Sequence, residues 1–480
     1  MVVKEKVLPY IEARQEMLIK VSDSIWEYAE TRYEEYKSSE LLCKVLAEEG
    51  FAVTKGIADM DTAFVASYGN GKPVIGFLGE FDALYGLSQE AGIAEKKPLI
   101  EGGKGHGCGH HALGVGSLAG VLALKEYMKE NNVKGTVKYF GCPAEEGGCG
   151  KVYLARAGYF NDIDAVLTWH PFTSSNIMTF NILATCSAYF KFHGISSHAA
   201  GSPHLGRSAL DAVELMNIGV NFLREHVEQD TRLHYAITNA GGSSPNVVQA
   251  EAAVLHQIRA PRISQVRDIY ERIINIAKGA ALMTDTKLEV VFDKASSNIL
   301  FNNVLGALVH EKFTEIGPVP ISDQDIEYAR EIRATLNEKE RHLDESLTVA
   351  MFGEGGREIV RQFSDKDIID FLYPYEPNEI VAMGSSDLAD VSWNVPTVSF
   401  QAVTYAKDTS PHSWQQVAQG KANLCHKGLL HAGKVMALAG AELLENPELL
   451  TKMKEEFDRR RDGEVYVCPI PPDVKPSPLR

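Results

Sequence analysis

Short apolar segments bounded by glycine or proline alternate with helical patterns in the first part of the chain, and this alternation limits the possible folds most strongly. Residues 74–79, 137–141 and 163–169 (VIGFLG, VKYFG and IDAVLTW) have the length and composition of buried strands. Residues 111–129 (HALGVGSLAGVLALKEYMK) have the length and the small-residue surface of a buried helix. Strands that alternate with helices predict an α/β fold, in which a mixed, largely parallel sheet has helices on both faces.

A different pattern begins near residue 186. Residues 186–200 (CSAYFKFHGISSHAA) alternate as a strand does, residues 205–227 have a long helical pattern, and two further strand-like segments follow. Helices and antiparallel strands between two α/β stretches predict an inserted α+β domain. We therefore expect the following division of the chain: a catalytic domain beginning at 1–185, the inserted domain at 186–297 and the second part of the catalytic domain at 298–480.

The charge and cysteine content restrict the partners and the compartment. The 480 residues include 64 Asp and Glu against 48 Lys and Arg, a formal net charge of −16, so we expect neither nucleic acid nor a membrane as partner. No apolar run approaches the ~20 residues that a membrane helix needs, and the N-terminus lacks the apolar core of a signal peptide. The 7 scattered cysteines, an odd number, argue against a disulfide framework and favour a cytoplasmic protein with reduced thiols.

Two segments combine glycine with residue types that bind metal ions. In GKGHGCGHHALGVG, Cys108 and His110 lie on a glycine-rich turn before a helix, so both side chains could point to one site. In GCPAEEGGCGK, Glu145 and Glu146 follow a strand, and adjacent carboxylates can act separately, one as a metal ligand and the other as a general base. Taken alone, each segment also has a simpler interpretation: a buried cysteine beside a helix cap in the first, and two solvated glutamates in the second.

Three further histidines are candidates for the same site. His170 directly follows the apolar strand AVLTW, at the strand end where ligand sites form in open α/β sheets. His412 lies in SPHSWQQ before a helix, and His198 lies in GISSHAAGSPHLGRSALDA of the predicted insert. Each of them alone could equally be a core or capping histidine, but their joint occurrence in this order with the two segments above is more specific.

Eight segments in order along the chain resemble the dinuclear metallopeptidase family of carboxypeptidase G, aminoacylase and the N-acyl-amino-acid amidohydrolases: GEFDAL, HGCGHHALG, PAEEGG, LTWHP, SSHAAGSPHLGRSALDA, GGSSPNVV, GSSDLADVSW and HSWQ. The resemblance covers nearly the whole chain, and the last two segments are most similar to the p-aminobenzoyl-glutamate hydrolase branch. It implies an amidohydrolase that uses two divalent metal ions, Mn²⁺ or Zn²⁺, and an inserted domain that mediates dimerisation and closes over the substrate. It also implies a small N-acyl or N-aroyl amino acid as substrate, with p-aminobenzoyl-glutamate as the leading example.

Carried over residue by residue, the resemblance implies a set of five metal ligands: Cys108, His110, Glu146, His170 and His412. Glu145 would be the general base, Asp82 would orient a metal ligand, and His198 would stabilise the oxyanion from the neighbouring protomer. The residues that would hold the carboxylate of the substrate are Asn246, Gly384, Ser385 and Ser386, together with Arg259, which could equally be a structural strand residue.

The chain departs from the family pattern around the first ligand loop. Glu80-Phe81-Asp82 stands where the family at large has His-x-Asp. In the first ligand loop, the family at large has an Asp at the position that the Cys-Gly-His group (CGH) occupies in this chain. His111 follows that group where the amidohydrolase branch commonly has Asp, and we expect His111 to pack rather than to bind metal. A ligand set with thiolate and imidazole suits Zn²⁺, whereas the similar family members indicate Mn²⁺.

Other functions agree with parts of this pattern. A dipeptidase or an acyl-amino-acid deacylase would use the same chemistry. A thiol hydrolase with Cys108 as nucleophile and His110 as base is disfavoured by their placement on one turn, and a catalytically silent regulatory or binding subunit is disfavoured because every expected position is filled. We expect a homodimer, or a heteromer with a related second chain, and the charged residues 320–380 receive no role from the sequence.

Overall fold

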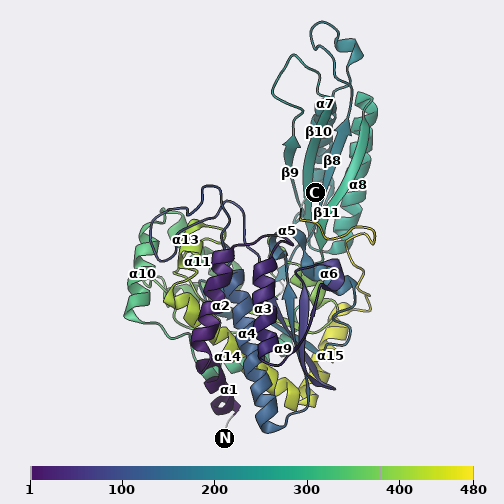
Figure 1. Ribbon diagram of the computed structural model, residues 1–480. Coiled ribbons are helices and arrows are strands. Elements are labelled where there is room, and N and C mark those ends of the chain that lie inside the picture. The colour runs from purple at the N-terminus through teal and green to yellow at the C-terminus, as the bar shows by residue number, and fades with distance from the viewer. Residues whose placement is uncertain (1–2, 379, 479–480) are drawn as a thin grey trace.

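The structure is a computed structural model that describes residues 3–378 and 380–478. A central sheet is packed between helices, and a second, smaller sheet with its own two helices projects from one end of this body (Figure 1). Among the described residues, no helix is both long enough and apolar enough to cross a membrane.

The central sheet has seven strands in the order β1-β2-β4-β3-β5-β13-β6. The four middle strands are parallel, and the strands at either side pair antiparallel, so the expectation of a mixed, largely parallel sheet is confirmed. Their bounds are β1 (Ala52–Lys55), β2 (Phe64–Asn70), β4 (Gly135–Cys142), β3 (Val74–Glu80), β5 (Ala165–Phe172), β13 (Thr397–Val403) and β6 (Asn176–Ile177). Because parallel strands end at the same edge of a sheet, the loops after β3, β4 and β5 meet there.

The long helix α4 (His110–Asn131) is buried along most of its length, because it packs against the sheet and beside α14 (Asn423–Glu445), which contacts the same strands. Glycines allow this close approach. A Cβ at Gly116 would come within 2.5 Å of the indole nitrogen of Trp169, and a Cβ at Gly433 would come within 2.6 Å of Ala119 Cβ. The N-terminal end of α4 is thereby held at the edge of the sheet where the strand loops converge.

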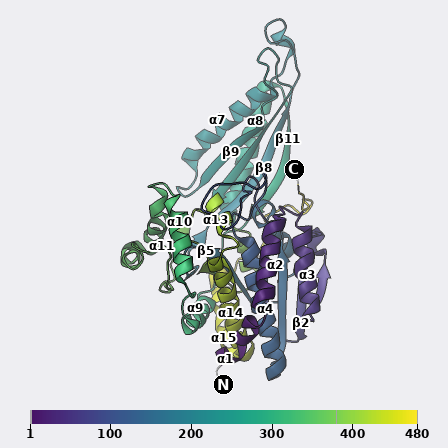
Figure 2. The ribbon, with the colours of Figure 1, turned by 60° about the vertical axis from the view of Figure 1, so that its left-hand side comes forward.

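Two hydrophobic cores cover the two faces of the central sheet. The first lies against a layer of helices from the N-terminal part and the C-terminal third of the chain, together with α4 (Figure 2): α1 (Val3–Glu12), α2 (Gln15–Tyr28), α3 (Tyr36–Glu48), α9 (Asn303–Ile316), α10 (Asp323–Ala334), α13 (Trp414–Gln419), α14 and α15 (Pro447–Arg461). The second contains α6 (Gly150–Arg156) and α12 (Leu388–Ser392) and continues into the projecting sheet. The short α5 (Glu145–Gly148) follows β4, and α11 (Leu343–Arg361) packs in a small third cluster.

The projecting unit is antiparallel throughout, in the strand order β11-β8-β10-β9. Its elements are β8 (Ala184–His193), α7 (Ala209–Leu223), β9 (Arg232–Asn239), β10 (Glu251–Ala260), α8 (Ile263–Thr284) and β11 (Lys287–Ser296). Buried and partly exposed residues alternate along β10, as expected for a sheet with helices on one face. A short parallel pair, β7 (Asn181–Ile182) with β12 (Val381–Ala382), lies where the chain enters this unit.

Candidate metal centre

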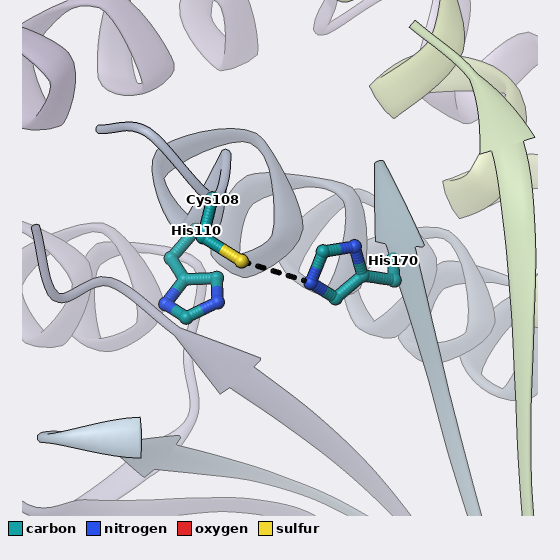
Figure 3. A group of neighbouring side chains, drawn as sticks. All are labelled: Cys108, His110 and His170. Atoms are coloured by element: carbon teal, nitrogen blue, oxygen red, sulfur yellow. Dashed lines mark hydrogen bonds between the residues drawn. The ribbon is translucent and has the colours of Figure 1, made fainter. Parts of the chain in front are cut away.

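The turn that carries Cys108 and His110 depends on the glycine between them. Gly109 has φ +80°, and a Cβ there would lie within 2.2 Å of the Tyr405 hydroxyl and 2.7 Å of Pro171. A side chain at this position would therefore be strained and would clash. With glycine present, Cys108 ends the loop and His110 begins α4, so both side chains face the ends of the central strands (Figure 3).

His170 completes the first group of donor atoms. It lies in β5, and its Nε2 is 3.4 Å from Cys108 Sγ (Figure 3). Its other ring nitrogen, Nδ1, donates to its neighbouring carbonyl, Pro171 O, at 2.9 Å. The ring is thus oriented with Nε2 towards the thiol.

Asp82 connects the two loops that carry the candidate ligands. One of its oxygens accepts the Nδ1–H of His110 at 2.7 Å, and the other accepts the backbone N–H of Glu146 at 2.9 Å. Asp82 is 1% exposed, so water does not weaken these hydrogen bonds. This placement matches the orienting role that the resemblance implies for Asp82.

His412 lies on the loop between β13 and α13, next to Glu146. Its Nε2 lies 3.1 Å from Glu146 Oε1, and its backbone N–H donates to Gly107 O at 2.8 Å. His412 has φ +59°, a left-handed conformation that is uncommon for a residue with a side chain. The contact with the Cys108 loop therefore holds His412 in a conformation that directs its ring to Glu146.

These donor atoms form overlapping groups that fit divalent metal ions. The ligand atoms of Cys108, His110 and His170 lie within 4.8 Å of one another, and so do those of Cys108, Glu146 and His412. A thiolate shared by two such groups is the arrangement expected for two neighbouring ions. The structure thus brings together all five residues that the sequence proposes as ligands.

The electrostatics of the site also fit cations. Burial raises the pKa of the Cys108 thiol, so the thiolate needs a positive charge beside it. Burial opposes ionisation of Glu146, but the close contact with the His412 ring and the charge of His110 outweigh it and lower its pKa to about 2. Glu145 differs, because burial and the neighbouring carboxylates of Glu80 and Asp387 raise its pKa to about 8.

A buried charge cluster beside the ligands was not foreseen from the sequence. Lys151 of α6 is 0% exposed, and its ammonium group lies between Glu80 Oε1, at 2.7 Å, and Asp387 Oδ1. Asp387 also accepts the backbone N–H of Lys151 at 2.9 Å. The other oxygen of Glu80, Oε2, lies 3.2 Å from His110 Nε2. Glu80 and Asp387 occur within motifs that mark the family, but nothing in their spacing indicates that Lys151 joins them.

The segment 320–380 supports the loop that carries His412. Asp344 of α11 accepts hydrogen bonds from Thr173 Oγ1 at 2.6 Å and from the backbone N–H of Asp408. Asp408 in turn accepts from Asp344 N at 3.0 Å and pairs with Arg333 of α10 at 3.2 Å. Thr173 follows His170 and Asp408 precedes His412, so this charged segment holds two of the ligand-bearing loops together.

Two of the three candidate residues in the insert, His198 and Asn246, lie far from this centre in the same chain. β8 leaves the central body at Ala184 and ends at His193, so the loops that follow it are at the distal end of the projecting sheet (Figure 1). His198 and Asn246 are both exposed there, and the two loops are joined by a hydrogen bond from Ala199 N to Asn246 O at 3.0 Å. In a single chain, the structure therefore does not bring His198 to the metal ligands.

Arg259 and the Gly384–Ser386 turn meet at the proximal end of the insert. Arg259 Nη1 donates to Ser385 Oγ at 3.0 Å and lies 3.3 Å from Met383 O. Arg259 is partly buried, and Gly384 is exposed. Asp387, at the end of this turn, contacts Lys151, so the turn is connected to the charge cluster beside His110.

His111 packs away from the ligand group. It is 0% exposed, and its Nε2 lies 2.8 Å from the carbonyl oxygen of Gly420. Burial lowers its pKa to about 4, so the ring is neutral and donates to that carbonyl.

The chain is similar to known peptidases and amide hydrolases. Residues 76–398 match the model of Peptidase family M20/M25/M40. The chain is 43% identical over 470 residues to the B-type subunit of p-aminobenzoyl-glutamate hydrolase from Escherichia coli (strain K12), covering 98% of each chain. It is 29% identical over 241 residues to the A-type subunit of that hydrolase, covering 48% of this chain and 54% of the relative. A dinuclear metal binding peptidase of the M20 family from Bacillus subtilis has the same fold, with a TM-score of 0.56 at 15% identity, over 90% of this chain and 99% of that chain.

Proposed function

Because the chain belongs to Peptidase family M20/M25/M40, we propose that it is a metal-dependent amidohydrolase that cleaves p-aminobenzoyl-glutamate to p-aminobenzoate and glutamate. The observation that carries this proposal is the convergence of Cys108, His110, Glu146, His170 and His412 in two groups that share the thiol. The 43% identity to one of the two subunits of a p-aminobenzoyl-glutamate hydrolase supports the choice of substrate.

Two divalent ions, Mn²⁺ or Zn²⁺, would supply an acidified water and polarise the amide carbonyl when bound. Glu145 lies near His110, but the two groups of ligand atoms that share the Cys108 thiol do not include it. Its pKa of about 8 is close to neutrality, which suits a group that accepts a proton from the attacking water and returns it to the leaving nitrogen. Asp82 keeps His110 in the tautomer whose Nε2 is available as a ligand.

The carboxylate of the substrate needs a positively charged or amide-rich subsite within an acidic protein. Arg259 reaches Ser385 at the proximal end of the insert, and we propose that Arg259 and Gly384–Ser386 contact this carboxylate. His198 and Asn246 lie at the distal end of the insert, so we propose that they serve the site of a second protomer. His198 would then donate to the oxyanion of the tetrahedral intermediate.

Exposed apolar side chains on the insert support such an assembly. β9 is an edge strand, and Tyr235 and Ile237 on it are 44% and 45% exposed. On the adjacent helix α7, Ile218 and Phe222 are 51% and 73% exposed. An unpaired edge strand beside an apolar helix face is a surface that a second copy would cover. We propose a homodimer through this surface, and the similarity to both subunit types of one hydrolase makes a heteromer the alternative.

The first test is elemental analysis of the purified chain, combined with assays of p-aminobenzoyl-glutamate cleavage with and without a chelator. We expect about two equivalents of Mn or Zn and loss of cleavage on chelation. A chain that binds no metal under metal-replete conditions would contradict the ligand set. Cleavage of dipeptides without cleavage of p-aminobenzoyl-glutamate would favour the dipeptidase.

The same assay distinguishes a catalytically silent chain. Two metal equivalents without turnover, followed by turnover when a homologue of the A-type hydrolase subunit is added, would identify a heteromer that needs the second chain. Turnover by this chain alone would exclude that alternative.

A further inference from the structure

When the His110 ring is neutral, Glu80 and His110 face each other through two atoms that both accept hydrogen bonds. His110 donates its Nδ1–H to Asp82, so in the neutral ring the opposite nitrogen, Nε2, carries a lone pair. Glu80 Oε2, a carboxylate oxygen that also only accepts, lies 3.2 Å from that nitrogen. Both side chains are nearly buried, with exposures of 6% for Glu80 and 1% for His110, so water cannot separate the lone pairs. A cation, either a proton or a metal ion, must therefore lie between His110 Nε2 and Glu80 Oε2.

The distance between these two atoms suits a shared metal ion. Ligand atoms that are each about 2.0–2.1 Å from a tetrahedral ion are separated by roughly 3.3 Å. Glu80, His110 and Glu145 form a third group whose ligand atoms all lie within 4.8 Å of one another. His110 therefore belongs to two groups of potential ligands. The family resemblance implies all members of the group with Cys108 and His170 as ligands, but it does not imply Glu80 as a ligand.

Lys151 holds Glu80 in the orientation that this role needs. Its ammonium group binds Glu80 Oε1 at 2.7 Å, which leaves Oε2 directed at His110. Lys151 is itself balanced by Asp387, and all three side chains are buried. The cluster has a formal charge of −1, so Lys151 does not neutralise both carboxylates, and a residual negative charge remains beside His110.

We propose that Glu80 is an additional ligand of the metal ion that His110 binds, and that Lys151 and Asp387 position its carboxylate. This inference rests on the proposed metal centre, but not on the identity of the substrate. Glu80 thereby adds an anionic oxygen to a set otherwise dominated by thiolate and imidazole, which makes the centre more suitable for harder ions such as Mn²⁺.

The test is a titration of the metal-free, full-length protein with Co²⁺, whose visible absorption depends on the number and type of its ligands. Glu80→Gln keeps the shape of the side chain, and it leaves Lys151 paired with Asp387, so no buried charge loses its partner. We expect the affinity for one Co²⁺ to fall more than ~100-fold, beyond the ~10–100-fold typical of residues that only orient a ligand. We also expect the absorption spectrum of that ion to change.

A triple variant separates the ligand role from a purely structural ion pair. Glu80→Gln combined with Lys151→Met and Asp387→Asn removes all three charges of the cluster together, so no buried charge is left without a partner. If Glu80 serves only as the counter-ion of Lys151, this variant regains wild-type Co²⁺ binding, which would overturn the proposal. We expect the binding to stay as weak as in the single variant, with thermal unfolding confirming that both variants fold.

Asp390→Asn is the matched control. Asp390 is equally buried, at 0% exposure, but its partners are Ser297 and Tyr466 instead of a metal ligand. It should leave Co²⁺ affinity and spectrum unchanged. A Glu80→Gln protein with wild-type spectrum, or with an affinity loss within the ~10–100-fold range, would overturn the proposal. Because Co²⁺ binding is read without substrate, failure to cleave p-aminobenzoyl-glutamate would leave this result interpretable.

Discussion

Glu145 and Glu146 are neighbours in the chain, but their surroundings differ. Glu146 faces His412 and is held ionised, with a pKa of about 2, whereas Glu145 faces the carboxylates of Glu80 and Asp387 and has a pKa of about 8. Consecutive side chains diverge, so one loop can supply a permanent ligand and a proton acceptor at the same time. Adjacency in the sequence only allows such a division, and the resemblance implies which glutamate takes which role; the different surroundings in the structure support this proposal.

Glu145→Gln therefore tests the base directly. We expect kcat to fall about 10²–10⁴-fold, because the amide cannot accept the proton of the attacking water, while two metal equivalents are retained. Glu146→Gln is the control and should lose metal instead. Steady-state kinetics with elemental analysis of both variants measure this, and a Glu145→Gln protein with wild-type turnover would exclude Glu145 as the base.

At the residue scale, the sequence indicates which residue types lie on the converging loops, but not every contact between them. Cys108, His110 and His170 could be chosen because each follows a glycine-rich turn or an apolar strand. Lys151 could not, since a lysine in a glycine-rich segment is normally solvated. Its burial follows from two carboxylates that come from β3 and from the turn before α12.

At the scale of elements, hydrogen bonds between segments that are distant in the sequence hold the parts of the molecule together around the site. Asp390 of α12 accepts hydrogen bonds from Ser297 N and Oγ, where the chain leaves β11, and from the Tyr466 hydroxyl of the C-terminal tail. One buried carboxylate thus joins the exit of the insert, the central body and the tail. Burial raises its pKa to about 7, although these hydrogen bonds oppose the shift.

This raised pKa predicts how stability depends on pH. A carboxyl group whose pKa is higher when folded than the usual ~3.9 stabilises the fold fully below pH ~4, and this contribution is lost as the pH rises towards 7. Asp390→Asn does not titrate, so between pH 5 and 8 its free energy of unfolding should improve relative to wild type by about 1–3 kcal/mol. Urea unfolding at both pH values, with the same excess of divalent cation, measures this difference. A difference that does not vary with pH would show that Asp390 is ionised throughout.

The role of the segment 320–380 also belongs to this scale. Its charged helical pattern is visible in the sequence, but its contacts are not, because Asp344 meets Thr173 and Asp408 only after chain segments 171 and 64 residues apart have been packed together. Sequence periodicity describes each helix by itself and contains no information on such partners.

At the scale of the whole molecule, the projecting insert separates His198 from the metal ligands of its own chain. The proposed homodimer predicts that two differently inactivated proteins restore activity when combined. His198→Ala alone should lower turnover about 10²–10³-fold, the usual effect of removing one oxyanion donor. Glu145→Gln inactivates the part of the site that the other protomer contributes, which contains the metal ligands and the general base.

In a mixed dimer of these two variants, one site has both Glu145 and His198 intact. Random exchange of protomers should therefore restore about a quarter of wild-type activity, since half of the dimers carry one intact site of two. Co-expression followed by light scattering and activity measurement tests this. If His198 served its own chain, no mixture would exceed the activity of the separate variants.

The sequence by itself determined the family, the mixed α/β fold and the residues that converge at the edge of the central sheet. These properties are local, since each follows from a strand end, a glycine turn or an ordered series of short motifs, and the family and the fold are confirmed. Only the tertiary structure decided that Lys151 is buried between Glu80 and Asp387, that α10 and α11 support the His412 loop, and that His198 lies at the distal end of the insert. Such contacts join segments that are far apart in the chain, and they depend on how helices and sheets pack, which no single segment encodes.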